Sequence, residues 1–325
     1  MRDETLQLRV MIINFADIER AAARILPYAV RTPVLRSAHL DELTGAQLLF
    51  KCENLQCAGA FKFRGACNAV MALADDVAAR GVVTHSAGNH GAALALAARL
   101  RGIPAYIVVP EGTVKSKIDA IREYGAALHF CAPTLAAREI ECERLREETG
   151  ATLVHPFENP DVIAGQGTAA LELIGAGGEL DLVMTPISGG GLIGGTAIAA
   201  RALLPQIKVC AAEPEGAADA FESLRRGERV TDVVPNTICD GLRASIGAVN
   251  FSLLQQFAVK VLPVSDAQSI AAMRLIFERL KLVIEPSSAT VLAAVLRHRE
   301  HFAGKRVGLI LSGGNVDLDR LPWQR

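Results

Sequence analysis

The sequence predicts an α/β fold in which parallel strands are covered by helices on both faces. Short apolar and β-branched runs alternate with helical stretches along most of the 325 residues. That alternation is typical of parallel strands joined by crossover helices. Half of the residues are hydrophobic, so a chain of this length can bury the core of one large domain or of two.

The expected elements follow from these runs. Each strand is a run of Val, Ile, Leu or Phe, and each helix is rich in Ala and Leu or in charged residues. The expected strands are 47–52, 81–85, 105–110, 126–130, 152–155, 182–187, 208–213 and 306–311. The expected helices are 63–73, 91–100, 115–124 and 135–148, with a further helix after Gly191. No Pro-rich or Ser-rich linker marks a domain boundary.

Charge and cysteine usage exclude several classes of function. Lys and Arg total 34 against 35 Asp and Glu, a net charge of −1, which argues against a nucleic-acid partner. No apolar run reaches the length of about 18 residues that a membrane span needs. The seven cysteines are odd in number and lack C-x-x-C spacing, so we expect neither zinc nor disulfides, and a cytoplasmic location.

The first chemical motif surrounds a lysine between two phenylalanines, Gly59-Ala60-Phe61-Lys62-Phe63-Arg64-Gly65. Burial disfavours an ammonium ion, so the pKa of Lys62 should fall toward that of a nucleophilic amine. Such a lysine can form an imine with a carbonyl compound. The alternative is a solvent-reaching lysine at a helix start, with Arg64 as an ordinary surface charge.

Two further motifs lie where a strand gives way to a helix. Ser86-Ala87-Gly88-Asn89-His90-Gly91 should leave backbone amides free at a helix N-terminus, where a carboxylate or phosphate can bind. The alternative is a helix cap without a ligand. The second motif, Ser188-Gly189-Gly190-Gly191, permits close approach of the backbone to a phosphate.

The glycine motif also suggests a second class of enzyme. Gly189, Gly191 and Gly194 satisfy the G-x-G-x-x-G pattern, and Glu213 ends the next expected strand, where a ribose-binding acid would lie. An NAD-dependent dehydrogenase is therefore an alternative, although it does not explain the Lys62 segment.

A fourth motif, Ser312-Gly313-Gly314-Asn315, follows the last expected strand. Ligands of open parallel sheets bind at the carboxyl ends of strands. One site there would bring Ser86, Gly189 and Ser312 together, whereas a plain turn is the alternative for Ser312 alone.

These four motifs, in this order and separation, resemble those of fold type II pyridoxal-phosphate enzymes. The resemblance is closest to the serine/threonine dehydratase (ammonia-lyase) and serine racemase family. It covers the chain from about residue 15 to its end and implies a two-domain, tryptophan synthase β-like fold. The large cofactor-binding domain would comprise residues 1–80 and 159–325, and the small substrate-binding domain residues 81–158.

The resemblance also implies roles for individual residues. Lys62 would bind the cofactor covalently and then act as the base at Cα. The implied cofactor-binding residues are Phe61, Lys62, Asn89, Ser188, Gly189, Gly190, Gly191 and Ser312. The implied substrate-binding residues are Ser86, Asn89, His90 and Arg138. A Mg²⁺, Mn²⁺ or Ca²⁺ site would use Glu213, the carbonyl of Ala217 and Asp219, for which a solvated acidic turn is the alternative.

We therefore expect a homodimeric lyase that converts L-threonine or L-serine to a 2-oxo acid and ammonia. Alternatives are a dehydratase for 3-hydroxyaspartate or phenylserine, and a serine racemase. Racemases of this family carry a serine where this chain has Ala87, and a methyl group cannot relay a proton, so we expect racemisation to be weak or absent. Ala60 replaces the usual Ser or Thr of the family, and Phe157 is typical of threonine dehydratases.

Overall fold

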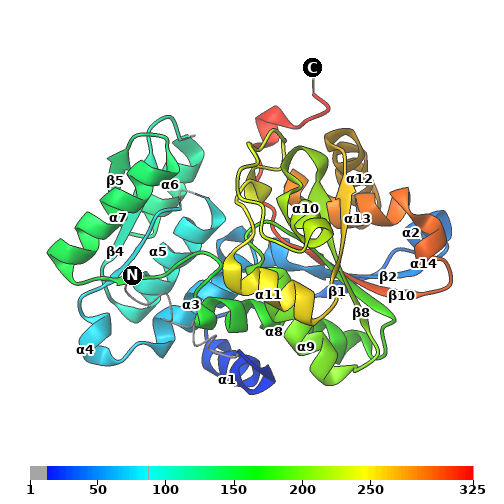
Figure 1. The fold of residues 1–325 in the computed structure, drawn as a ribbon, viewed down its shortest axis with the longest axis horizontal. Helices are drawn as coiled ribbons and strands as arrows, with labels where there is room; N and C mark the ends of the chain where they lie inside the picture. Colours follow the sequence, from blue (N-terminus) through cyan, green and yellow to red (C-terminus); the bar gives the residue numbers. More distant parts are fainter. Residues whose placement is uncertain (1–12, 87, 114, 325) are drawn as a thin grey trace.

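The computed structural model describes residues 13–86, 88–113 and 115–324. Within these ranges the strands form two sheets, with helices packed around both (Figure 1). None of the described helices is both long and apolar enough to span a membrane.

The larger sheet has six strands in the order β1-β2-β10-β7-β8-β9. They are β1 (Val34–Leu35), β2 (Gln47–Cys52), β10 (Arg306–Leu311), β7 (Leu182–Pro186), β8 (Lys208–Pro214) and β9 (Lys260–Val264). The short edge strand β1 is antiparallel to β2, and the other neighbouring pairs are parallel. The sequence did not predict β9, because Pro263 interrupts its apolar run. Proline is tolerated there because β9 is an edge strand.

The smaller sheet is parallel and has the order β5-β4-β3-β6. Its strands are β3 (Val82–Thr84), β4 (Ala105–Pro110), β5 (Ala127–Cys131) and β6 (Thr152–Leu153). All four come from residues 82–153, whereas the larger sheet uses chain segments on both sides of them. The division into domains 1–80 with 159–325, and 81–158, stays a prediction.

The helices lie on both faces of the sheets. They are α1 (Phe15–Ile25), α2 (Ala38–Thr44), α3 (Lys62–Ala72), α4 (Asp75–Ala78), α5 (Asn89–Arg101), α6 (Lys115–Glu123), α7 (Leu135–Thr149), α8 (Pro160–Gly177), α9 (Gly191–Leu203), α10 (Asp219–Arg226), α11 (Ala248–Gln256), α12 (Asp266–Leu280), α13 (Pro286–Arg297) and α14 (Arg299–Phe302). Short 3₁₀ turns are η1 (Glu53–Leu55), η2 (Cys57–Gly59), η3 (Glu215–Ala217), η4 (Asp240–Leu242) and η5 (Leu318–Arg320).

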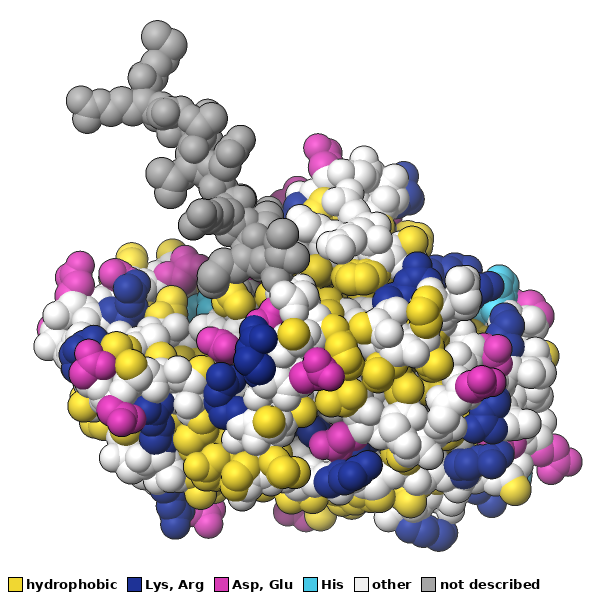
Figure 2. Space-filling model, turned by 90° about the horizontal axis from the view of Figure 1, so that it is seen from below, with side chains coloured by type: hydrophobic (Ala, Val, Ile, Leu, Met, Phe, Trp, Pro, Cys, Tyr) yellow, Lys and Arg dark blue, Asp and Glu magenta, His cyan; other side chains and the backbone are white. Residues whose placement is uncertain are grey.

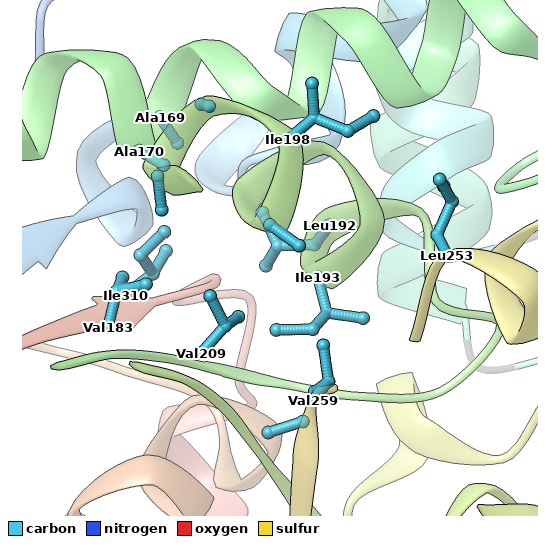
Figure 3. Packing of buried hydrophobic residues seen from close by; sticks show 14 of the residues in the cluster. Ala169, Ala170, Val183, Leu192, Ile193, Ile198, Val209, Leu253, Val259 and Ile310 are labelled. Carbon is cyan, nitrogen blue, oxygen red and sulfur yellow. The ribbon is translucent and has the colours of Figure 1, made fainter. Parts of the chain in front are cut away.

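Alternating side chains of the central strands point into two separate cores. Val183 and Ile310 pack beneath α8 and α9 (Figure 3), whereas their neighbours Met184 and Leu309 pack against α12 and α13 on the opposite face. This alternation is what the two-residue repeat of a strand dictates. Burial on both faces explains why these strands read as continuous apolar runs in the sequence.

Candidate active site

The Lys62 segment connects β2 to α3 through two tight turns. Ala58 and Gly59 both have positive φ, 57° and 70°, and a Cβ on Gly59 would lie 2.3 Å from Oδ1 of Asn315. The Phe61 amide donates to the Ser312 carbonyl at 2.9 Å, and the Gly314 amide donates to the Gly59 carbonyl at 2.9 Å. The lysine segment is thus fixed directly to the turn that follows β10.

The side chain of Lys62 points into the protein. Its Nζ donates to the Pro156 carbonyl at 2.8 Å and lies 5.2 Å from the centre of the Phe61 ring. Burial lowers the pKa of Lys62 to about 8, and the negative charge of Glu285 partly opposes that shift. An appreciable fraction of the amine is therefore uncharged near neutral pH.

Arg64 is fully buried, which excludes its interpretation as a surface charge. Its guanidinium donates to both carboxylate oxygens of Glu53, at 2.7 and 2.8 Å, and to both of Glu172, at 2.8 Å each. Lys51 also pairs with Glu172. This cluster of two cations and two anions carries no sequence motif, although Lys51 within an apolar strand is a signal for it.

The loop between β3 and α5 holds Ser86, Asn89 and His90. A Cβ on Gly91 would lie 1.9 Å from the Ser86 carbonyl oxygen, so only glycine lets the helix approach this strand end. The first-turn amides of α5 have no partner within the helix, which suits a carboxylate. Ala87 lies outside the described residues.

The imidazole ring of His90 is not available to bind a carboxylate. Its Nε2 lies 3.0 Å from the Val154 carbonyl, which makes it the donor. Its Nδ1 is buried without a hydrogen-bond partner among the described residues, and burial lowers the pKa of His90 to about 3. A neutral ring with its N–H already committed cannot bind a carboxylate, so His90 has only its backbone amide to offer.

Asn89 connects two loops that are distant in the sequence. Its Nδ2 donates to both oxygens of the Glu285 carboxylate, and its Oδ1 accepts from Nδ2 of Asn315 at 2.9 Å. Glu285 itself is buried. Both partners are functional candidates whose roles the sequence did not indicate.

The Ser188-Gly189-Gly190-Gly191 turn leads from β7 into α9. Gly190 has φ +92°, and a Cβ there would lie 2.5 Å from Ile246. A Cβ on Gly189 would overlap the Phe157 ring at 2.3 Å. Ser188 Oγ donates to the Ala244 carbonyl at 2.9 Å and accepts from the Ala244 amide at 3.0 Å. The free first-turn amides of α9 fit a phosphate, and the lack of side chains keeps the turn narrow.

Ser312 is buried at the end of β10, with its Oγ 3.1 Å from Oγ of Ser288. Ser288 also bonds the Gly313 backbone in both directions, accepting from its amide and donating to its carbonyl. The sequence did not indicate a role for Ser288, because the residues around it in α13 form no distinctive motif.

Arg138 lies on α7, half-buried, with Nε donating to the Thr134 carbonyl. Its positive charge contributes to a lowered pKa of His85, after the larger effect of burial. The positive charge of Arg138 thus acts on the residue that precedes Ser86.

The carboxylates of Glu213 and Asp219 interact at the end of β8, and Ala217 lies between them in the chain, in η3. The Glu213 carboxylate accepts from the amides of Ala220 and Phe221, at 3.0 and 2.9 Å, and Asp219 Oδ2 accepts from the Ile246 amide at 2.7 Å. Burial raises the pKa of Glu213 to about 8, with a further contribution from Asp219, whose own pKa is raised to about 6. Two buried carboxylates that repel each other fit a hard divalent cation.

Comparisons with known proteins identify relatives along almost the whole chain. Residues 25–313 match the model of a family described as pyridoxal-phosphate dependent enzymes. A β-hydroxyaspartate dehydratase of Paracoccus denitrificans (strain Pd 1222) is 47% identical, over 96% of this chain and 99% of that protein. The structure of maize serine racemase has a TM-score of 0.92 at 45% identity, covering 94% of each chain. The serine racemase structure from Dictyostelium discoideum has a TM-score of 0.91 at 47% identity, covering 94% of this chain and 99% of that chain.

Proposed function

The chain belongs to the family of pyridoxal-phosphate dependent enzymes, and we propose that it dehydrates and deaminates a β-hydroxy L-amino acid. The products are a 2-oxo acid and ammonia, and L-threonine and L-serine are the default substrates. The observation that carries the proposal is the Lys62 amine, whose pKa is lowered to about 8. Lys62 lies beside the turn that holds Ser312, and its positive charge contributes to the lowered pKa of His90, in the loop that holds Ser86.

Pyridoxal phosphate fits the turns around Lys62, because glycines and free helix amides leave a narrow anion site there. When bound, the cofactor supplies the electron sink that makes a substrate Cα proton acidic. The residues that we propose to hold it are Lys62 by a covalent bond, Phe61 against the ring, Asn89 at the 3′-oxygen, Ser312 at the ring nitrogen, and Ser188, Gly189, Gly190 and Gly191 at the phosphate.

The substrate carboxylate is proposed to bind in the loop before α5. Ser86, Asn89 and His90 surround the free helix amides, and His90 takes part through its backbone. Arg138 contributes a positive charge from α7, next to His85. Together these groups hold the α-carboxylate and leave Cα facing Lys62.

Lys62 then performs the proton transfers. The amine of Lys62 is freed when the amino group of the substrate takes its place on the cofactor. This neutral amine then takes the proton from Cα, the Cβ–O bond breaks, and the proton that Lys62 gained leaves with the departing hydroxide as water. The released enamine hydrolyses to the 2-oxo acid and ammonia. Ser312 is a neutral group and cannot hold the ring nitrogen protonated as a carboxylate would, which favours prompt loss of the β-hydroxyl.

The relatives support alternatives within the same chemistry. A β-hydroxyaspartate dehydratase is among them, so 3-hydroxyaspartate is an alternative substrate, as is phenylserine. Serine racemases are also among them, and racemisation is the second alternative. We expect it to be weak because of Ala87, and Ala87→Ser should raise it. The NAD-dependent dehydrogenase suggested by the glycine spacing is set aside, because that spacing lies within the matched family region.

Three further features are part of the proposal. A divalent cation binds Glu213, the Ala217 carbonyl and Asp219, where buried carboxylates repel each other. The protein is a homodimer, for which exposed apolar side chains at Leu26, Tyr28 and Val30 offer contact area. It acts in the cytoplasm, consistent with seven cysteines that are all unpaired.

On the face in Figure 2, acidic and basic side chains are interspersed, consistent with a small-molecule substrate and no nucleic-acid partner.

The test is a visible spectrum of the purified protein before and after addition of a panel of β-hydroxy amino acids. Formation of 2-oxo acid and ammonia is followed in the same samples. We expect a cofactor absorption that responds to one substrate, together with equal yields of the two products. Lys62→Ala should lose both the absorption and the turnover. A protein that pyridoxal phosphate does not colour, or one that gives only the D-amino acid, would overturn the proposed dehydration.

A further inference from the structure

His155 lies on the segment between β6 and α8, directly before the residue that contacts Lys62. The Pro156 carbonyl accepts from Lys62 Nζ at 2.8 Å. The imidazole of His155 is half-buried, and its own contacts determine where it carries a proton.

Two backbone amides fix the tautomer of His155. Its Nδ1 accepts from the amide of Glu158 at 3.1 Å and from that of Phe157 at 3.4 Å. A nitrogen that accepts carries no proton, so the ring N–H is on Nε2. Burial, with the nearby His85 and Lys62, lowers the pKa of His155 to about 4. The ring is therefore a neutral donor at physiological pH.

Neighbouring rings hold the imidazole in place. His85 packs against it with ring centres 5.6 Å apart and planes at 70°, and Phe157 packs against it at 4.6 Å and 85°. Edge-to-face contacts of this kind restrict rotation of the ring. His155 is thus fixed in both orientation and protonation state.

Several other polar side chains of the site already have hydrogen-bond partners among the described residues. Ser188 bonds Ala244, Ser312 lies against Ser288, and the ring N–H of His90 faces Val154. Asn89 contacts Glu285 and Asn315. The Nε2–H of His155 has no partner of this kind within the described part of the chain, and the positive charge of Lys62 contributes to the lowered pKa of the His155 ring.

We propose that Nε2–H of His155 donates a hydrogen bond to the β-oxygen of the substrate and so selects amino acids that carry a hydroxyl group at Cβ. This inference rests on the proposed dehydration. Negative charge grows on that oxygen as the Cβ–O bond breaks, and a fixed donor stabilises it without giving up its own proton. The proton that completes the water still comes from Lys62.

The test compares two leaving groups on one enzyme. The substrates are the β-hydroxy amino acid that the wild type dehydrates and β-chloro-L-alanine, whose chloride leaves without a hydrogen-bond donor. His155→Phe should lower kcat/KM for the hydroxyl substrate by about 100-fold and change that for β-chloro-L-alanine only a few-fold. His155→Gln, which retains an N–H donor, should restore part of the loss.

The control is His129→Phe, a histidine on β5 that pairs with Tyr106 and Glu141, and it should leave both substrates unaffected. Equal losses on both substrates in His155→Phe would show a packing role and overturn the proposal. If His155→Phe does not fold, the two substrates are compared on His155→Gln instead. A larger loss for the hydroxyl substrate than for β-chloro-L-alanine supports the proposal, and equal losses overturn it. A wild type that eliminates from neither substrate would instead refute the proposed function, so the two failures are distinguishable.

Discussion

Asn89 and Glu285 are joined by two hydrogen bonds of 3.1 Å, from one amide nitrogen to both oxygens of one carboxylate. They are 196 residues apart in the chain. Asn89 begins α5, which packs on the smaller sheet, and Glu285 precedes α13, which packs on the larger one. The pair therefore links the two sheet regions next to Lys62. The negative charge of Glu285 raises the pKa of Lys62.

Glu285→Gln should make Lys62 react at lower pH. The Glu285 carboxylate raises the pKa of Lys62 against the larger lowering by burial. Without it, the pKa should fall below about 8, so more of the amine is neutral at any pH near neutrality. The measurement is the rate at which cofactor-free protein gains visible absorption with pyridoxal phosphate, across neutral and alkaline pH. Glu179→Gln, on the surface, is the control, and an unchanged midpoint in Glu285→Gln would contradict the prediction.

Arg64→Met should destabilise the fold strongly. It leaves the fully buried Glu53 without its guanidinium partner, and breaking a buried ion pair costs about 3–5 kcal/mol. Arg64→Lys should recover only part of this, because an ammonium cannot make both two-oxygen contacts. Denaturant unfolding checks the values. Arg225→Met, which breaks the exposed pair with Glu222, should stay within about 0.5 kcal/mol.

Gly190→Ala should weaken cofactor binding by about tenfold or more. The substitution meets a positive φ of 92° and places a Cβ 2.5 Å from Ile246, so the turn must move. The readout is the affinity for pyridoxal phosphate, measured by titration of the cofactor-free protein. Gly227→Ala is a matched control, because Gly227 has a similar left-handed backbone conformation, φ 77° and ψ 4°, but open space around its Cβ position. Equal effects of the two variants would mean that backbone strain alone is responsible.

Asp219→Asn should remove the response of stability to divalent cations. The variant keeps an oxygen for the Ile246 amide but loses the charge that lies beside Glu213. Magnesium at about 100 times its dissociation constant should stabilise the wild type by about 2.7 kcal/mol and leave the variant unchanged. Thermal unfolding with and without a chelator measures this. Asp232→Asn, at an exposed position, should respond as the wild type does.

The sequence predicted the strands well because most are buried on both faces and read as apolar runs. Of the four motifs, the structure joins the Lys62 and Ser312 segments by backbone hydrogen bonds. The partners of these motifs could not be predicted. Asn315 meets Asn89 across 226 residues, and Glu285 has no pattern around it that would indicate where its side chain points.

The orientation of side chains was also beyond the sequence. His90 stands in a motif that suggests anion binding, yet the Val154 carbonyl takes its ring N–H. His155 belongs to none of the four motifs, and its free donor follows from the backbone amides of Phe157 and Glu158. Local contacts of this kind appear only once the chain is folded.

The position of β10 between β2 and β7 determines when during synthesis the larger sheet can close. Until residue 311 has left the ribosome, β2 has only β1 beside it, and β7, β8 and β9 form a separate ribbon. The Ala60–Gly313 bridge forms later still, so Lys62 reaches its final setting among the last events of folding. A nascent chain that stops before Arg306 would carry two unpaired strand edges, at β2 and at β7, and would be prone to aggregation.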